Sequence, residues 1–136
     1  MSNRFSQFCI LFLLLIGSSF VYANGQTSEL NETMKKIGFS YKQIMKAKTA
    51  DEALDAISEM ELLIEKSKAL GFKPELKDKS FEGLNKVEKQ LDELVPLLQA
   101  GELDKAKEHA SKIDALRKEY HKLHEPPSFW ELLFGK

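Results

Sequence analysis

The chain has 136 residues, of which 20 are basic and 21 acidic, giving a formal net charge of −1 at pH 7. This length suits one domain. A near-neutral chain without a basic stripe has no electrostatic basis for binding nucleic acid, so we expect no nucleic-acid partner. The only cysteine, Cys9, lies in an N-terminal apolar run. We therefore expect no disulfide, no thiolate chemistry and no thioether attachment of a cofactor in the mature protein.

The first 23 residues have the pattern of a secretory signal peptide. Arg4 precedes an apolar run at 8–16, and Val21-Tyr22-Ala23 resembles the small-residue cleavage site of a signal peptide. We predict cleavage after Ala23, a helical domain over 24–127 and an aromatic tail over 128–136. The alternative is a retained anchor, but the run is shorter than the ~20 residues that span a bilayer. We expect no integral membrane segment after cleavage.

Two amphipathic helices are predicted in the first half of the domain. Ser28 is the expected N-cap of the first, whose apolar positions recur every three or four residues. These positions are Leu30, Met34, Ile37, Tyr41, Ile44 and Met45. The second helix is expected to start at the capping box Thr49-Ala50-Asp51-Glu52 and to end at Leu70-Gly71.

Two further helices follow a predicted loop over 71–79. Ser80 is the expected cap of the third helix, and Pro96 should kink that helix near its end. After a tight connection at Ala100-Gly101, the fourth apolar stripe runs to Leu123, and Pro126-Pro127 stops it.

No segment alternates with the period of a strand, so we predict an all-α, antiparallel up-down-up-down four-helix bundle. This topology brings the start of the first helix, the loop and the end of the fourth helix to one end. Met34 and His121 are then expected to face each other across the core. Methionine sulfur opposite histidine nitrogen is a pair that can hold a haem iron from both sides.

Two segments carry a resemblance to a known family. Leu30-Asn31-Glu32-Thr33-Met34 and Arg117-Lys118-Glu119-Tyr120-His121 resemble the opening and closing motifs of the cytochrome b562 family, exported four-helix haem proteins. The resemblance covers roughly 29–124. It implies a periplasmic carrier of single electrons, not an enzyme, with Met34 and His121 as axial ligands of the haem iron.

The resemblance also indicates the haem type. The related cytochromes c-prime have Cys-x-x-Cys-His at the place where this chain has Arg117 and Tyr120 before His121. We therefore expect non-covalent haem b. Arg117, one helical turn before His121, could bind a haem propionate. Phe72, Phe81 and Leu84 are candidate pocket walls.

Each of these residues also has a structural interpretation. Met34 could be a flexible core filler, and His121 a solvated histidine beside Tyr120. Arg117 could be an ordinary surface charge near a helix C-terminus, where the helix dipole favours cations. The pocket-wall residues could be plain core.

A second function is consistent with the end of the fourth helix. His121-x-x-His124-Glu125 has a spacing that could bind zinc, copper or nickel, although His109 lies three turns away. The alternative is therefore a haem-free periplasmic helical-bundle module that binds a divalent metal or a protein partner. We find no nucleophile, base and orienting group in sequence, so we expect no hydrolytic site.

The tail is too hydrophobic to be an ordinary polar terminus. Its large apolar residues include Phe129, Trp130, Leu133 and Phe134. We expect the tail to pack against the haem end, and the alternative is that it docks on a membrane surface or a partner. The sequence does not identify the redox partner protein.

Overall fold

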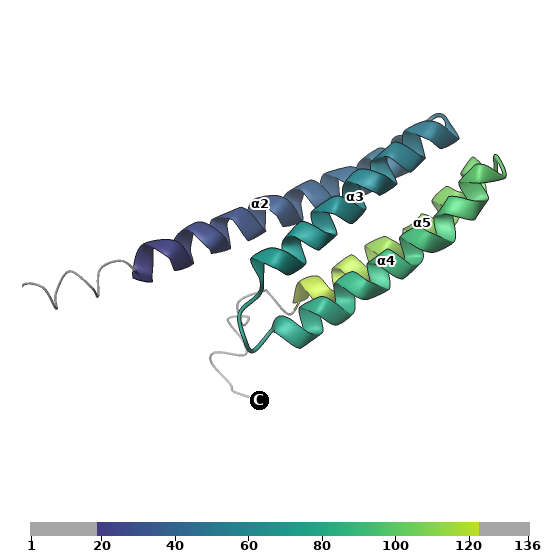
Figure 1. Cartoon of the computed structure of the whole chain (residues 1–136). Coiled ribbons are helices and arrows are strands. Elements are labelled where there is room, and N and C mark those ends of the chain that lie inside the picture. Colours follow the sequence, from purple (N-terminus) through teal and green to yellow (C-terminus); the bar gives the residue numbers. More distant parts are fainter. Residues whose placement is uncertain (1–18, 123–136) are drawn as a thin grey trace, which may run out of the picture.

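The structure is a computed structural model that describes residues 19–122, with side chains from Ser28 onwards. Its elements are α2 (Ser19–Lys46), α3 (Ala50–Leu70), α4 (Lys77–Gln99) and α5 (Leu103–His121) (Figure 1). The described residues contain no strand. The all-α fold is confirmed, and the four helices are those of a four-helix bundle.

Helix α2 begins at Ser19, nine residues before the predicted cap Ser28, so that prediction was wrong. The segment between them contains no proline. Gly25 is its only strongly unfavourable residue, and one helical glycine costs only about 1 kcal/mol. The helix runs through Ala23, and cleavage after that residue stays a prediction.

The start of α3 is the predicted capping box. The Thr49 side chain accepts a hydrogen bond from the Glu52 backbone N–H at 3.2 Å. The Glu52 carboxylate accepts one from the Lys48 N–H at 2.7 Å, one residue earlier than the usual reciprocal bond. At the other end, Gly71 has a φ of 82° and donates its N–H to the Ser67 carbonyl, which confirms the predicted stop.

The connection between α3 and α4 is shorter than predicted, and Ser80 is not a cap. Leu76 donates its N–H to the Lys73 carbonyl at 2.9 Å in a turn with Pro74 at the second position, where proline is favoured. This turn starts α4 at Lys77. Ser80 therefore lies inside the helix, where it is buried.

Pro96 is exposed on α4, and the helix continues past it to Gln99. A proline this close to a helix end removes one backbone hydrogen bond without ending the helix at that point.

A Schellman motif ends α4. Gly101 has a φ of 74° and donates its N–H to the Leu98 carbonyl at 2.9 Å, and Glu102 donates to the Leu97 carbonyl at 2.9 Å. The predicted tight connection at Ala100-Gly101 is confirmed. Only glycine adopts this backbone conformation without strain.

The helices associate mainly as two pairs, α2 with α3 and α4 with α5, and Figure 1 shows these pairs lying side by side. Contacts between α2 and α5 are the sparsest of these neighbouring pairs. The buried hydrophobic residues form one core along the bundle. The core includes Ile37, Ile44, Ile57, Met60, Ile64, Leu84, Leu91, Leu94, Leu98 and Ile113. Within residues 19–122, no helix has the length and apolar character needed to cross a membrane.

Candidate functional site

Tyr41 on α2 and Asp114 on α5 show how these two helices face each other. Burial raises the pKa of the Tyr41 phenol, and the negative charge of Asp114 raises it further, while Arg117 and Lys118 lower it. Such charge effects weaken with distance, so this part of α5 lies on the same side of the bundle as Tyr41, in agreement with the contacts between α2 and α5.

Met34 on α2 and His121 on α5 are each seven residues from one of these reference residues. Met34 is seven residues before Tyr41, and His121 is seven residues after Asp114. Seven residues make about two helical turns, or about 10 Å. Because α2 and α5 run in opposite directions in Figure 1, both intervals lead toward the same end of the bundle. The two intervals therefore place Met34 and His121 toward the same end of the bundle.

Met34 lies at the edge of the core rather than inside it. Its side chain is 38% exposed, whereas the preceding residue, Thr33, is buried. The Met34 sulfur accepts a hydrogen bond from the Ser67 hydroxyl of α3 at 3.7 Å. The sulfur is therefore held by a buried polar group while part of the side chain stays accessible.

His121 is the last residue of α5, and its side chain is exposed. Its neighbour Tyr120 packs against Gly83 of α4 so closely that a Cβ on Gly83 would lie 2.6 Å from the Tyr120 ring. The Tyr120 hydroxyl donates to Glu82 at 2.9 Å and accepts from Lys86 at 2.7 Å. Hydrogen bonds from Lys86 and then Tyr120 lower the pKa of Glu82 to about 2.

These contacts fix the direction in which His121 points. Tyr120 faces α4, and successive residues of a helix are about 100° apart around its axis. His121 is therefore turned away from α4. Its seven-residue spacing from Asp114 places it on the side of α5 that faces α2.

Arg117 forms an ion pair with Asp114 at 2.9 Å, and Lys118 binds the same carboxylate at 2.7 Å. Lys118 and then Arg117 lower the pKa of Asp114. Arg117 follows the fully buried Ala110 by seven residues, so it lies on the side of α5 that faces the core, yet its side chain is 51% exposed. Among the described residues of α5, Ile113 is the last buried one.

The residues at this end fit a haem group. Met34 is accessible, and a Cβ added at Gly38, one turn further along the same side of α2, would meet no atom within 4 Å. Arg117 supplies a positive charge where the apolar core stops. Thioether and imidazole can ligate a haem iron, and a guanidinium can pair with a haem propionate.

The candidate pocket walls gather at the same end. The rings of Phe72 and Phe81 lie edge to face with centroids 6.0 Å apart, and Leu84 is buried nearby in α4. Leu84 belongs to the hydrophobic core and Phe72 packs against it, whereas Phe81 is half-buried beside Phe72.

The second predicted site falls largely outside the described residues. His124, Glu125 and the tail residues Phe129, Trp130, Leu133 and Phe134 all lie beyond residue 122. Between residues 19 and 122, no three His, Cys, Asp or Glu side chains gather to hold a metal ion. His109 contacts Glu93 at 2.8 Å in the seam between α4 and α5. Docking through the tail stays a prediction.

Three residues of this end have roles that sequence reasoning missed. The sequence placed Ser67 on an apolar stripe, but its hydroxyl binds the Met34 sulfur. It gave no role to Gly83, which Tyr120 packs against, and no partner to Asp114, which pairs with Arg117. A small polar residue on an apolar stripe and a glycine inside a helix are both signals of a close contact. The sequence does not name the group that makes the contact.

The fold and this end define a class of protein: a helical bundle with a thioether, an imidazole and a cation at one end. A family model, cytochrome b562, matches residues 29–125, which is most of the chain. The chain therefore belongs to the cytochrome b562 family, whose members are haem-binding electron-carrier bundles and not enzymes. The family is typically periplasmic. A search of curated proteins finds no match.

Proposed function

We propose that this protein is an exported b-type cytochrome that carries single electrons, with Met34 and His121 as the axial ligands of a non-covalent haem b. The observation that carries the proposal is that α2 and α5 are in contact and run in opposite directions, so that the start of α2 and the end of α5 lie at one end of the bundle. Family membership over residues 29–125 supports it. The proposal includes an antiparallel up-down-up-down order, which the pairing of α2 with α3 and of α4 with α5 supports.

The ligand pair accounts for the activity. An iron with protein ligands on both faces has no vacant position for oxygen or substrate, so it exchanges single electrons, and a thioether ligand raises its potential. Ser67 keeps the Met34 sulfur oriented before binding. The contact of Tyr120 with Gly83 positions His121.

Arg117 and Lys118 supply positive charge for the propionates. Both now bind Asp114, so binding a propionate requires Arg117 to share or exchange this carboxylate. Guanidinium binds carboxylates through paired hydrogen bonds, which suits this exchange. No cysteine precedes His121 at the positions of Arg117 and Tyr120, so nothing there can attach haem covalently.

Export rests on the sequence of residues 1–23. A cationic start, an apolar run and a cleavage site that ends in Ala23 are typical of a cleaved signal peptide. The periplasm is the compartment in which the family is typically found.

Haem titration of the purified exported chain tests the proposal. We expect one haem per chain and the sharp absorption bands of low-spin iron after reduction. Met34→Ala should give high-spin iron, and His121→Ala should weaken binding by at least about tenfold, since each removes one ligand.

Two matched variants separate ligation from damage to the helices. Met45→Ala changes another methionine of α2, and His109→Ala another histidine of α5, so both should keep the low-spin spectrum. Absence of haem uptake by the native chain would refute the function, and a colourless preparation that binds zinc would favour the haem-free module. A low-spin spectrum in Met34→Ala would refute that ligand assignment.

A further inference from the structure

The exposed large hydrophobic side chains of residues 28–122 all belong to the pair α2 and α3. They are Met34, Phe39, which is 60% exposed, and Leu62, which is 73% exposed. Met34 belongs to the haem end. Phe39 and Leu62 have no part in the haem site, and exposed apolar side chains that share one surface can mark an interaction site.

Phe39 and Leu62 both point outward from this pair. Leu62 lies two residues from each of the buried residues Met60 and Ile64, so it projects from the opposite side of α3. Phe39 is about 140° around α2 from Met34, which lies on the side that faces α5. Both side chains therefore lie on the surface of α2 and α3 that faces away from α4 and α5.

The two residues also lie at similar heights. The hydrogen bond between Ser67 and Met34 fixes how α3 lies against α2. Phe39 is five residues after Met34, and Leu62 is five residues before Ser67. Because the two helices are joined by the short turn at 47–49, these intervals run in the same direction along the bundle. We call the surface of α2 and α3 that carries Phe39 and Leu62 the outer face.

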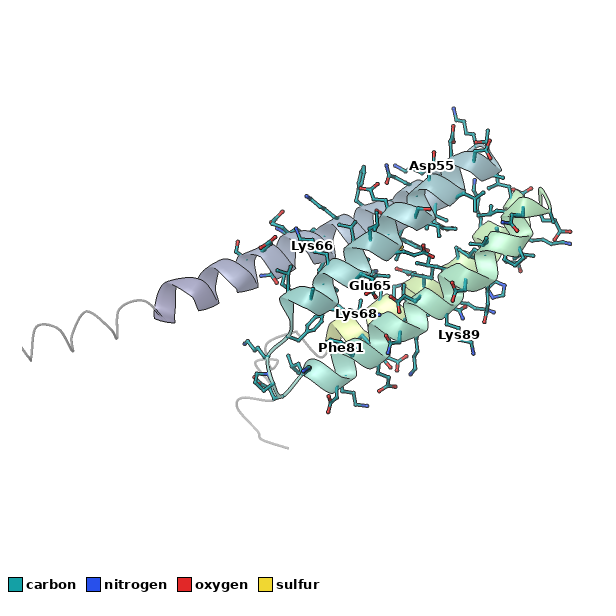
Figure 2. All side chains as sticks on the ribbon, in the orientation of Figure 1. Asp55, Glu65, Lys66, Lys68, Phe81 and Lys89 are labelled. Atoms are coloured by element: carbon teal, nitrogen blue, oxygen red, sulfur yellow. The ribbon has the colours of Figure 1, made fainter. Side chains whose placement is uncertain are left out.

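Opposite charges flank the two hydrophobic residues. Three lysines follow the side of α2 that carries Phe39: Lys35 lies four residues before it, and Lys42 and Lys46 lie three and seven residues after it. On α3, Asp55 and Glu59 are seven and three residues before Leu62. Figure 2 shows Asp55 toward the end of α3 that adjoins the turn, and Lys66 toward the other end. Toward the turn at 47–49, the α2 half of the outer face is basic and the adjoining α3 half is acidic. At the other end, Lys35 is paired with Glu32 and Lys66 with Glu29.

These charges are available for a partner. Lys42, Lys46, Asp55 and Glu59 take part in none of the ion pairs that the described residues form. Their side chains are exposed.

We propose that the outer face binds the outer face of a second copy of this chain in a two-fold symmetric dimer. A two-fold axis parallel to the helices lays α2 of one subunit over α3 of its partner at the same height. Phe39 then meets the partner subunit's Leu62. Lys42, three residues after Phe39, meets the partner subunit's Glu59, and Lys46, seven residues after Phe39, meets the partner subunit's Asp55. Symmetry repeats these contacts, so each favourable pair occurs twice.

The arrangement of charge favours a second copy over a different protein. A partner with one acidic surface would fit the α2 half but be repelled by the α3 half, and a basic partner would meet the reverse conflict. A second copy presents acid to base in both halves. The dimer requires no haem, so it stands or fails independently of the proposed function.

Sedimentation equilibrium of the purified exported chain tests the dimer, and this measurement does not depend on the haem titration. We expect a mass that rises with concentration to twice that of one chain. Phe39→Ser and Leu62→Ser should each raise the dimer dissociation constant by about tenfold or more, since each change removes two apolar contacts. Both residues are exposed, so circular dichroism should show unchanged folding.

Charge reversal gives a sharper test. Lys46→Glu and Asp55→Lys should each give a monomer, because each puts like charges together twice. Mixing the two variants should restore a dimer of one chain of each kind, in which both pairs are again opposite in sign. Rescue by mixing would not occur if Lys46 and Asp55 acted only within one chain.

Lys89→Glu is the matched control, because Lys89 is an exposed lysine of α4 away from the outer face (Figure 2). It should leave the mass unchanged. A native chain that stays monomeric up to about 1 mM, where a weak association saturates, would overturn the proposal. A dimer unaffected by any of the outer-face variants would overturn it as well.

Discussion

The contact between Tyr120 and Gly83 is where a single residue decides the position of a proposed ligand. The Tyr120 ring occupies the space that any side chain at residue 83 would need. The adjacent His121 takes its direction from Tyr120. Gly83 therefore matters for the haem end although it touches neither proposed ligand.

Gly83→Ala tests this dependence. The added Cβ would lie 2.6 Å from the ring of Tyr120, so the end of α5 must move. We expect the free energy of unfolding to fall by about 1–3 kcal/mol, as for other overpacked cores. We also expect weaker haem binding, measured by titration, because His121 moves with Tyr120.

Gly38→Ala is the control for this change. It adds the same methyl group to another helix, at a position with no atom within 4 Å. In the haem-free protein it should stabilise α2 by about 0.5–1 kcal/mol, because alanine is the better helix former. Equal destabilisation by both variants would show that the Tyr120 contact is not the cause.

At the scale of elements, the seam between α3 and α4 contains charged groups. Lys68 of α3 binds Glu88 of α4 at 2.7 Å and Glu65 of its own helix at 2.9 Å (Figure 2 labels Glu65 and Lys68). Glu61 lies one turn before Glu65. Burial raises the pKa of Glu61, and the negative charges of Asp92 and Glu88 raise it further.

Glu61→Gln should therefore stabilise the bundle at pH 7. Because the pKa of Glu61 is higher in the folded state than its ordinary value of 4.5, folding favours the protonated form, and stability falls as pH rises through this interval. The amide should gain about 0.5 kcal/mol at pH 7, a modest figure because the site is partly solvated. Urea unfolding at pH 7 and below pH 4 measures the difference.

The gain should disappear below pH 4, where the native Glu61 is protonated. Glu108→Gln, a change at an exposed carboxylate of α5 outside the outer face, should have little effect at either pH. A gain from Glu61→Gln that persists at low pH would contradict the explanation based on its charge.

At the scale of the whole molecule, the bundle has a densely packed part and a looser end. The pairs α2 with α3 and α4 with α5 pack extensively, whereas α2 and α5 share few contacts. On α5 the buried residues of the described segment stop at Ile113. A haem bound between Met34 and His121 would join the two pairs where protein contacts are sparsest.

Hydrogen exchange tests this view of the molecule. In the haem-free protein, backbone amides near Met34 and after Ile113 should exchange faster than those near Ile57 and Leu94, which lie in the packed core. Haem should slow exchange most at the first two places, because it stabilises only the state that binds it. Uniform protection along all four helices would contradict a looser end.

Much of this fold could be predicted from the sequence. The Thr49 capping box, the Gly71 stop and the Gly101 turn are local features, because each depends on residues within one or two turns. The start of α2 was misplaced because no residue between Ser19 and Ser28 stops a helix. The start of α4 was misplaced because a turn at Pro74, rather than the side chain of Ser80, begins it.

The candidate site was predictable only as a pair of motifs at the ends of two helices. Met34 and His121 follow from sequence pattern and topology. The partners of these residues do not, because Ser67 is 33 positions from Met34 and Gly83 is far from Tyr120 in the chain. Arg117 was identified as a cation, but its pairing with Asp114 needed the structure.

The sequence by itself determined the four helices and the family, because helical periodicity, caps and motifs depend on residues that are close together in the chain. Only the tertiary structure decided that Met34 is partly exposed and bound to Ser67. It also decided that the packing of Tyr120 on Gly83 turns His121 away from α4. The shared outer face of Phe39 and Leu62 likewise came from the structure. These features depend on the rotation and height of one helix against another. Side chains distant in the chain fix both, so no local pattern reports them.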